Sequence, residues 1–158
     1  MTKQKHTMRA IGRREFVVAT AAGAGLLALG ATARPALAAT PESKTLLEQL
    51  TKGKAKEGRI TLRLPEIAEN GNTVPIALAV ESPMTAQDYV KKVTVLADGN
   101  PNPRVAELHF GPNSGKADVQ LRIRLAQTQN IVAVAEMSNG SLWTASKEIK
   151  VTIGGCGG

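Results

Sequence analysis

The first hydrophobic pattern beyond residue 38 has the spacing of a helix. Leu46, Leu47 and Leu50 would lie together on one helical face. Thr40 is a suitable N-cap residue, and Pro41 suits the first helical position. The polar, glycine-containing stretch KGKAKEG follows and ends the pattern. The sequence therefore predicts a short helix within an N-terminal segment of residues 39–57.

From residue 58 to residue 153 apolar residues alternate with polar ones, which is the period of a strand with one buried face. The stretch ITLRL shows this alternation most clearly. Stretches rich in Gly, Pro, Asn and Ser, such as ENGNTVP, ADGNPNP and SNGS, separate the alternating runs and predict turns. The pattern predicts seven strands, over residues 60–64, 76–82, 90–97, 105–110, 117–125, 131–137 and 148–153.

Seven short strands separated by turns predict an all-β fold, an immunoglobulin-like antiparallel β-sandwich over residues 58–153. Apolar residues make up 42% of the chain but include only four aromatics, so Val, Ile, Leu and Ala must build the core. This composition favours strands. The chain has a single cysteine, so no disulfide can join the two sheets. The fold prediction therefore depends on strand number and alternation.

The first 38 residues have the three parts of an export signal. Basic residues open the segment, a mildly apolar run follows over residues 16–33, and Ala-Leu-Ala closes it. Arg13 and Arg14 precede the apolar run as in the twin-arginine consensus. An uncleaved membrane anchor would need a longer and more apolar run. We therefore expect a cleaved twin-arginine signal peptide over residues 1–38, a periplasmic location and no membrane association of the mature form.

The net charge changes once this signal is removed. The full chain has a formal net charge of +7, which by itself would suggest a nucleic-acid partner. Residues 1–38 hold six of the 20 basic residues but only one of the 13 acidic residues, so the mature chain has a net charge of +2. We therefore expect no nucleic-acid partner.

The mature chain contains few residues that could carry catalysis. Its only histidine, His109, lies on a predicted strand, where alternation directs it outward, opposite Leu108 and Phe110. The carboxylates are scattered singly, as on solvated strand faces. A blue-copper site needs two histidines and a cysteine with a further ligand close behind it, whereas two glycines follow Cys156. We therefore expect no catalytic residue, no metal site and no cofactor.

The chain ends on VTIGGCGG, which holds its only cysteine. Gly154 and Gly155 precede Cys156, and Gly157 and Gly158 follow it. Glycine has the widest backbone freedom and no side chain, so residues 154–158 predict a thin, flexible arm with an exposed, reactive thiol. The arm reaches at most roughly 17–18 Å, enough to enter a deep pocket. Catalysis in place needs fixed geometry, so the pattern favours a carrier thiol.

Alternative roles for this cysteine fit the sequence less well. A chance cysteine in a disordered terminus would oxidise and cross-link in the periplasm. Prenylation needs aliphatic residues after the cysteine. Ubiquitin-like sulfur carriers also end in Gly-Gly, but their activation uses ATP, which an exported protein lacks. The alternative that stays open is a periplasmic binding or structural module, anchored to a partner by a disulfide through Cys156.

Four stretches of the chain resemble the SoxY family, the sulfur-carrier subunits of the thiosulfate-oxidising Sox system. These stretches are ITLRLPEIAENGNTVPIALAVESPMTAQDYV, VLADGNPNP, RIRLAQTQNIVAVAEMSNGS and VTIGGCGG. The resemblance covers essentially the whole mature chain, and its most specific motif is the terminal GGCGG.

The resemblance implies a heterodimer with the SoxZ subunit and three partner enzymes. A haem-containing enzyme conjugates thiosulfate to the carrier cysteine, a manganese thiosulfohydrolase releases sulfate, and in many organisms a sulfane dehydrogenase oxidises the remaining persulfide sulfur. Carried over to this chain, Cys156 is the covalent attachment site, and Gly154, Gly155, Gly157 and Gly158 form the flexible arm. The resemblance implies a carrier without a cofactor that is not itself an enzyme.

Overall fold

A computed structural model describes residues 39–154 of the chain. The predicted signal peptide therefore lies outside the described residues, together with its arginine pair, and so does most of the predicted arm. The site residues concerned are Arg13, Arg14, Gly155, Cys156, Gly157 and Gly158. Of the predicted arm, Gly154 is described.

Helix α2 (Pro41–Thr51) confirms the predicted N-terminal helix. The Thr40 hydroxyl accepts a hydrogen bond from the Ser43 backbone N–H at 3.2 Å, which satisfies one of the unpaired donors at the helix start. Lys52 ends the helix in the left-handed conformation, with φ of 50°. Within the described part of the chain, no helix is long and apolar enough to cross a membrane.

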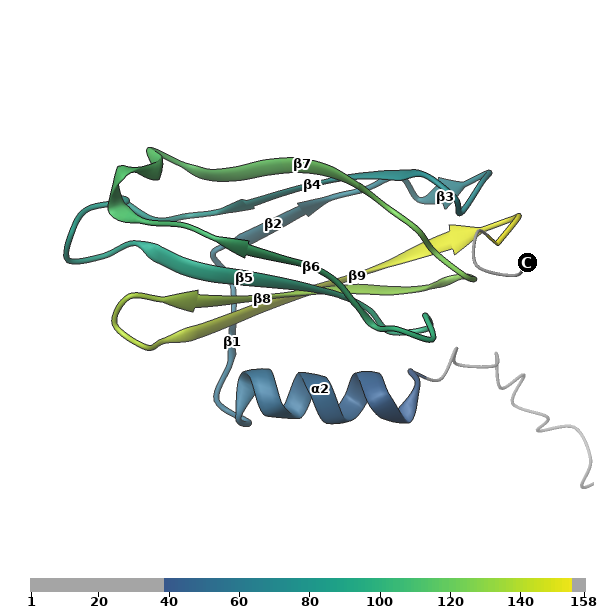
Figure 1. The fold of residues 1–158 in the computed structure, drawn as a ribbon, viewed down its shortest axis with the longest axis horizontal. Helices are drawn as coiled ribbons and strands as arrows, with labels where there is room; N and C mark the ends of the chain where they lie inside the picture. Colours follow the sequence, from purple (N-terminus) through teal and green to yellow (C-terminus); the bar gives the residue numbers. More distant parts are fainter. Residues whose placement is uncertain (1–38, 155–158) are drawn as a thin grey trace, which may run out of the picture. The chain divides into compact units, whose positions relative to one another are not determined.

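Two sheets form a β-sandwich (Figure 1), which confirms the predicted all-β, immunoglobulin-like fold. The larger sheet has the order β1-β9-β8-β5-β6, and β3 also pairs with β9. The smaller sheet has the order β2-β4-β7. The strands are β1 (Lys56–Glu57), β2 (Ile60–Arg63), β3 (Ile67–Ala68), β4 (Val74–Val80), β5 (Val90–Ala97), β6 (Arg104–His109), β7 (Ala117–Ile123), β8 (Gln129–Met137) and β9 (Leu142–Val151), and a 3-10 turn (Pro112–Ser114) precedes β7.

All seven predicted strands are present, but the last one differs in its bounds. β9 begins at Leu142 and ends at Val151, whereas the alternation predicted residues 148–153. Its first half has no clear alternation, because half-buried residues occupy successive positions there. Backbone pairing with β8, from Glu136 opposite Leu142 onward, holds this half in the sheet. The two-residue strands β1 and β3 pair with β9 in parallel and were not predicted.

The main core lies between the two sheets, where the inward-facing residues of each strand meet. Leu78 of β4, Val93 of β5 and Ile149 of β9 are at most 1% exposed. On the other face of the larger sheet, the leucines Leu46, Leu47 and Leu50 of α2 pack against Leu96, Val132 and Val134. This cover explains why β5 and β8 are buried on both faces and have long apolar runs in place of strict alternation.

Candidate functional site

The C-terminal segment leaves the larger sheet through a short stretch, residues 151–154, which we call the arm root. One side of the arm root is hydrogen-bonded to the loop that follows β3. The Thr152 backbone N–H donates to the Ala68 carbonyl at 3.1 Å, and its hydroxyl donates to the Glu69 carbonyl at 2.8 Å. The Gly71 backbone N–H donates to the Ile153 carbonyl at 2.7 Å. The chain is therefore held in place for two residues beyond the end of β9.

The other side of the arm root rests on the loop between β7 and β8. The Thr128 hydroxyl accepts a hydrogen bond from the Val151 N–H at 2.9 Å. Gly154 lies so close to Ala126 that a Cβ at this position would overlap the Ala126 carbonyl oxygen and lie 3.2 Å from its carbonyl carbon. A residue with a side chain could not keep this approach. Gly154 therefore belongs to the anchored base of the segment.

A buried polar network fixes this loop from below. Asn100 is 5% exposed and Gln129 is 1% exposed, and the Gln129 side-chain amide donates to Asn100 Oδ1 at 2.9 Å. Asn100 Oδ1 also accepts from the Ala126 N–H at 2.9 Å, and Asn100 Nδ2 donates to the Arg124 carbonyl at 2.8 Å. Gln129 Oε1 accepts from the Gly99 N–H at 2.6 Å. The network joins three loops into one support beneath the arm root.

Sequence reasoning did not predict this support. It treated ADGNPNP as a turn and assigned Asn100, Thr128 and Gln129 no role. The only signal was indirect, because VLADGNPNP and RIRLAQTQN are among the stretches that resemble the SoxY family. The partners in these hydrogen bonds are separated by up to 29 residues, so no local pattern brings them together.

The predicted outward position of His109 is confirmed. Its side chain is 69% exposed, and its Nε2 lies 3.0 Å from Glu107 Oε1 on the same face of β6. Among residues 39–154, no group of three or more His, Cys, Asp and Glu side chains is arranged to hold a metal ion. The predictions that concern Cys156 and the later glycines lie beyond the described residues and stay predictions.

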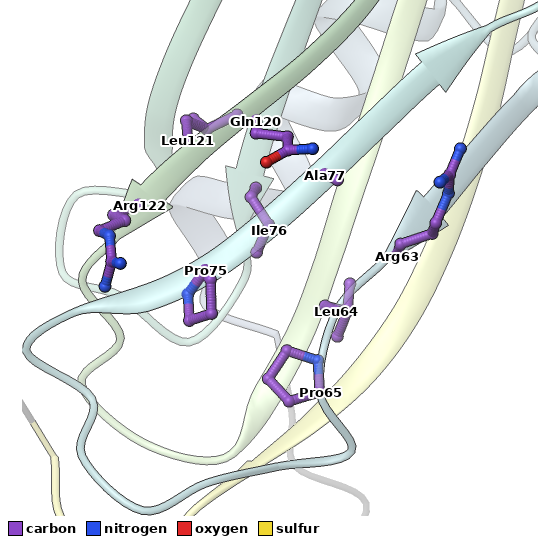
Figure 2. A pocket seen from close by; sticks show the side chains of 9 residues that line it. All are labelled: Arg63, Leu64, Pro65, Pro75, Ile76, Ala77, Gln120, Leu121 and Arg122. Carbon is purple, nitrogen blue, oxygen red and sulfur yellow. The ribbon is translucent and has the colours of Figure 1, made fainter.

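A hollow of about 580 Å³ lies on the outer face of the smaller sheet. Figure 2 shows Arg63 and Arg122 on opposite sides of it, with Pro75 and Ala77 of β4 between them. Gln120 supplies an amide, and the other lining residues are Leu64, Pro65, Ile76 and Leu121. The lining contains no carboxylate, histidine or cysteine. Its guanidinium and amide groups can bind a polar partner but offer no general acid or base for catalysis near neutral pH.

Comparisons with known proteins place this fold and this chain end in context. A family model described as "Sulfur oxidation protein SoxY" matches residues 45–156, a range that includes both sheets and the position of Cys156. No match was found among curated proteins.

Several solved structures share the fold. A superoxide reductase (neelaredoxin) from Ignicoccus hospitalis has a TM-score of 0.53 and 23% sequence identity, over 73% of this chain and 95% of that chain. A superoxide reductase from Nanoarchaeum equitans has a TM-score of 0.50 and 14% identity, over 61% of this chain and 98% of that chain. At these identities the similarity concerns the fold alone.

Proposed function

The chain belongs to the SoxY family of sulfur oxidation proteins, and from this membership we propose that it carries thiosulfate-derived intermediates covalently on Cys156. The observation that carries the proposal is that the family match extends to residue 156, the only cysteine of the chain. The protein would present its adduct to the enzymes of the Sox system and would not itself be an enzyme.

The chemistry of a thiol suits this role. In the first step, the Cys156 thiol and thiosulfate form a cysteine S-thiosulfonate, releasing one proton and two electrons that the haem-containing partner accepts. Water then cleaves the outer S–S bond in the thiosulfohydrolase, which releases sulfate and a proton and leaves a persulfide. A persulfide is a reversible state of cysteine, so the thiol can be restored and used again.

The arm root supports the proposal through its geometry. Hydrogen bonds to Ala68, Glu69 and Gly71 hold residues 152–153, so any movement of the thiol begins beyond them. The Cα of Cys156 is three residues from that of Ile153 and stays within roughly 11 Å of it. A thiol on such a short tether can enter a partner's pocket while the folded domain stays outside.

The location and the partners belong to the same proposal. A twin-arginine signal over residues 1–38 would deliver the protein to the periplasm, where thiosulfate oxidation by this system would take place. Membership of the family implies partners in the Sox system such as SoxZ. We further propose a heterodimer with SoxZ and successive encounters with the conjugating enzyme, the manganese thiosulfohydrolase and the sulfane dehydrogenase.

The variant Cys156→Ser tests the proposal directly. In a reconstituted Sox system it should abolish thiosulfate-dependent electron flow, while the fold and the binding of SoxZ survive. Mass spectrometry of the wild-type protein from sulfur-oxidising cells should find sulfur adducts on the C-terminal peptide. Retained electron flow in the variant would refute the carrier role, and a stable protein–protein disulfide at Cys156 would favour the anchored module.

A further inference from the structure

Two large apolar side chains in the described part of the chain are exposed, and both lie at the arm root. Ile67 is 55% exposed and Ile153 is 66% exposed. Ile67 lies in β3, opposite Lys150 of β9. Ile153 is itself part of the arm root, and its carbonyl is bonded to Gly71. Figure 1 shows β3 beside the end of β9, so the two isoleucines belong to the same end of the sandwich.

Isolated exposed apolar residues are normal on protein surfaces. These two differ because the fold does not need them as isoleucines. Ile153 lies beyond the last strand and is held through its backbone carbonyl, so a polar side chain would fit equally well. Ile67 likewise contributes backbone pairing while most of its side chain faces solvent. Grouped apolar exposure of this kind marks a surface that another protein covers.

The length of the chain beyond the arm root identifies what covers it. The Cα of Cys156 stays within roughly 11 Å of the Ile153 Cα, so an active site can receive the thiol only if its entrance comes against the arm root. We propose that Ile67 and Ile153 form an apolar docking surface for the entrance of a partner enzyme's active-site channel, and that this entrance carries apolar side chains. The inference rests on the proposed carrier function.

A permanent subunit does not fit this surface. The paired subunit of the heterodimer stays bound throughout the cycle, and covering the arm root would block every enzyme that must receive Cys156. The surface must instead be free between encounters and covered during each one. Because the short tether applies to every enzyme in the cycle, successive partners should use the same two isoleucines and compete for them.

The test uses the heterodimer with Ile67→Ser, Ile153→Ser and the double variant. KM for the carrier should rise about fivefold to tenfold for each substitution with the conjugating enzyme and with the thiosulfohydrolase, because each removes an apolar contact from the interface. The kcat should change little. The control Ile153→Val keeps an apolar side chain and should keep nearly the wild-type KM.

Two further measurements separate the possible outcomes. Iodoacetamide should label Cys156 of the serine variants at the wild-type rate, and the affinity of the heterodimer should be unchanged. A wild-type KM in the double variant, with activity that still requires Cys156, would overturn the docking surface and leave the carrier function intact. Weakened heterodimer formation would also overturn it, because the isoleucines would then belong to the permanent interface.

Discussion

The buried network beneath the arm root predicts a large loss of stability for Asn100→Ala. Asn100 is 5% exposed, and its side chain makes three hydrogen bonds, with Ala126 N–H, Gln129 Nε2 and the Arg124 carbonyl. Alanine removes all three. Gln129 Nε2 keeps the Gln127 carbonyl as an acceptor at 3.0 Å, so the two backbone groups at Ala126 and Arg124 bear most of the loss.

The magnitude follows from those two backbone groups. A buried polar group that loses its partner costs about 1–3 kcal/mol. Both groups are only partly buried, so water recovers part of this cost and we expect a total of about 3 kcal/mol. A loss of this size is a large fraction of the roughly 5–15 kcal/mol that stabilises a typical domain.

Urea unfolding of the mature chain measures this loss, with Cys156→Ser as background to prevent cross-linking. Trp143 is the only tryptophan and lies under the Arg59 guanidinium, 5.1 Å from the ring centroid, so its fluorescence should report the loss of tertiary structure. With a typical urea dependence, the midpoint should fall by about 2 M.

Asn139→Ala is the matched control. Asn139 Oδ1 accepts a single hydrogen bond, from the Ser141 N–H at 2.9 Å, in an exposed turn. Its removal should cost no more than about 0.5 kcal/mol. If Asn100→Ala lost less than about 1 kcal/mol, or no more than the control, the network would not support the arm root.

The remaining predictions concern export and the arm. Changing Arg13 and Arg14 to Lys should leave folded protein and its paired subunit in the cytoplasm, and unchanged periplasmic amounts on cell fractionation would contradict the twin-arginine signal. Replacing Gly154 and Gly155 together with Val should lower turnover with the partner enzymes by orders of magnitude while small thiol reagents still label the cysteine, since the arm becomes thicker and stiffer. Gly154→Ala alone should slow turnover about tenfold, because its Cβ would displace the arm root from Ala126, and wild-type turnover would show that this anchoring has no role. Thr128→Val should lower the free energy of unfolding by about 1 kcal/mol, because the Val151 N–H loses its acceptor, and an unchanged urea midpoint would refute that contact.

Much of this fold could be predicted because local patterns express it. Thr40 and Pro41 placed the start of α2 at the observed residue, since capping depends only on neighbouring side chains. The bounds of β5 agree with the alternating and apolar run that predicted residues 90–97. The proposed chemical role also came from a local feature, the terminal GGCGG, whose composition and family resemblance need no tertiary structure.

Only the tertiary structure decided how the arm is held and what surrounds it. β3 is two residues long, too short for any periodicity, and exists because β9 pairs with it. Asn100 and Gln129 are ordinary turn and strand residues in sequence, and become a support because the fold brings loops 29 residues apart into hydrogen-bonding distance. Gly154 looked like the first residue of a free arm, but the approach of the Ala126 carbonyl makes it part of the base. Long-range backbone pairing creates these contacts, and a local pattern of polar and apolar residues does not contain them.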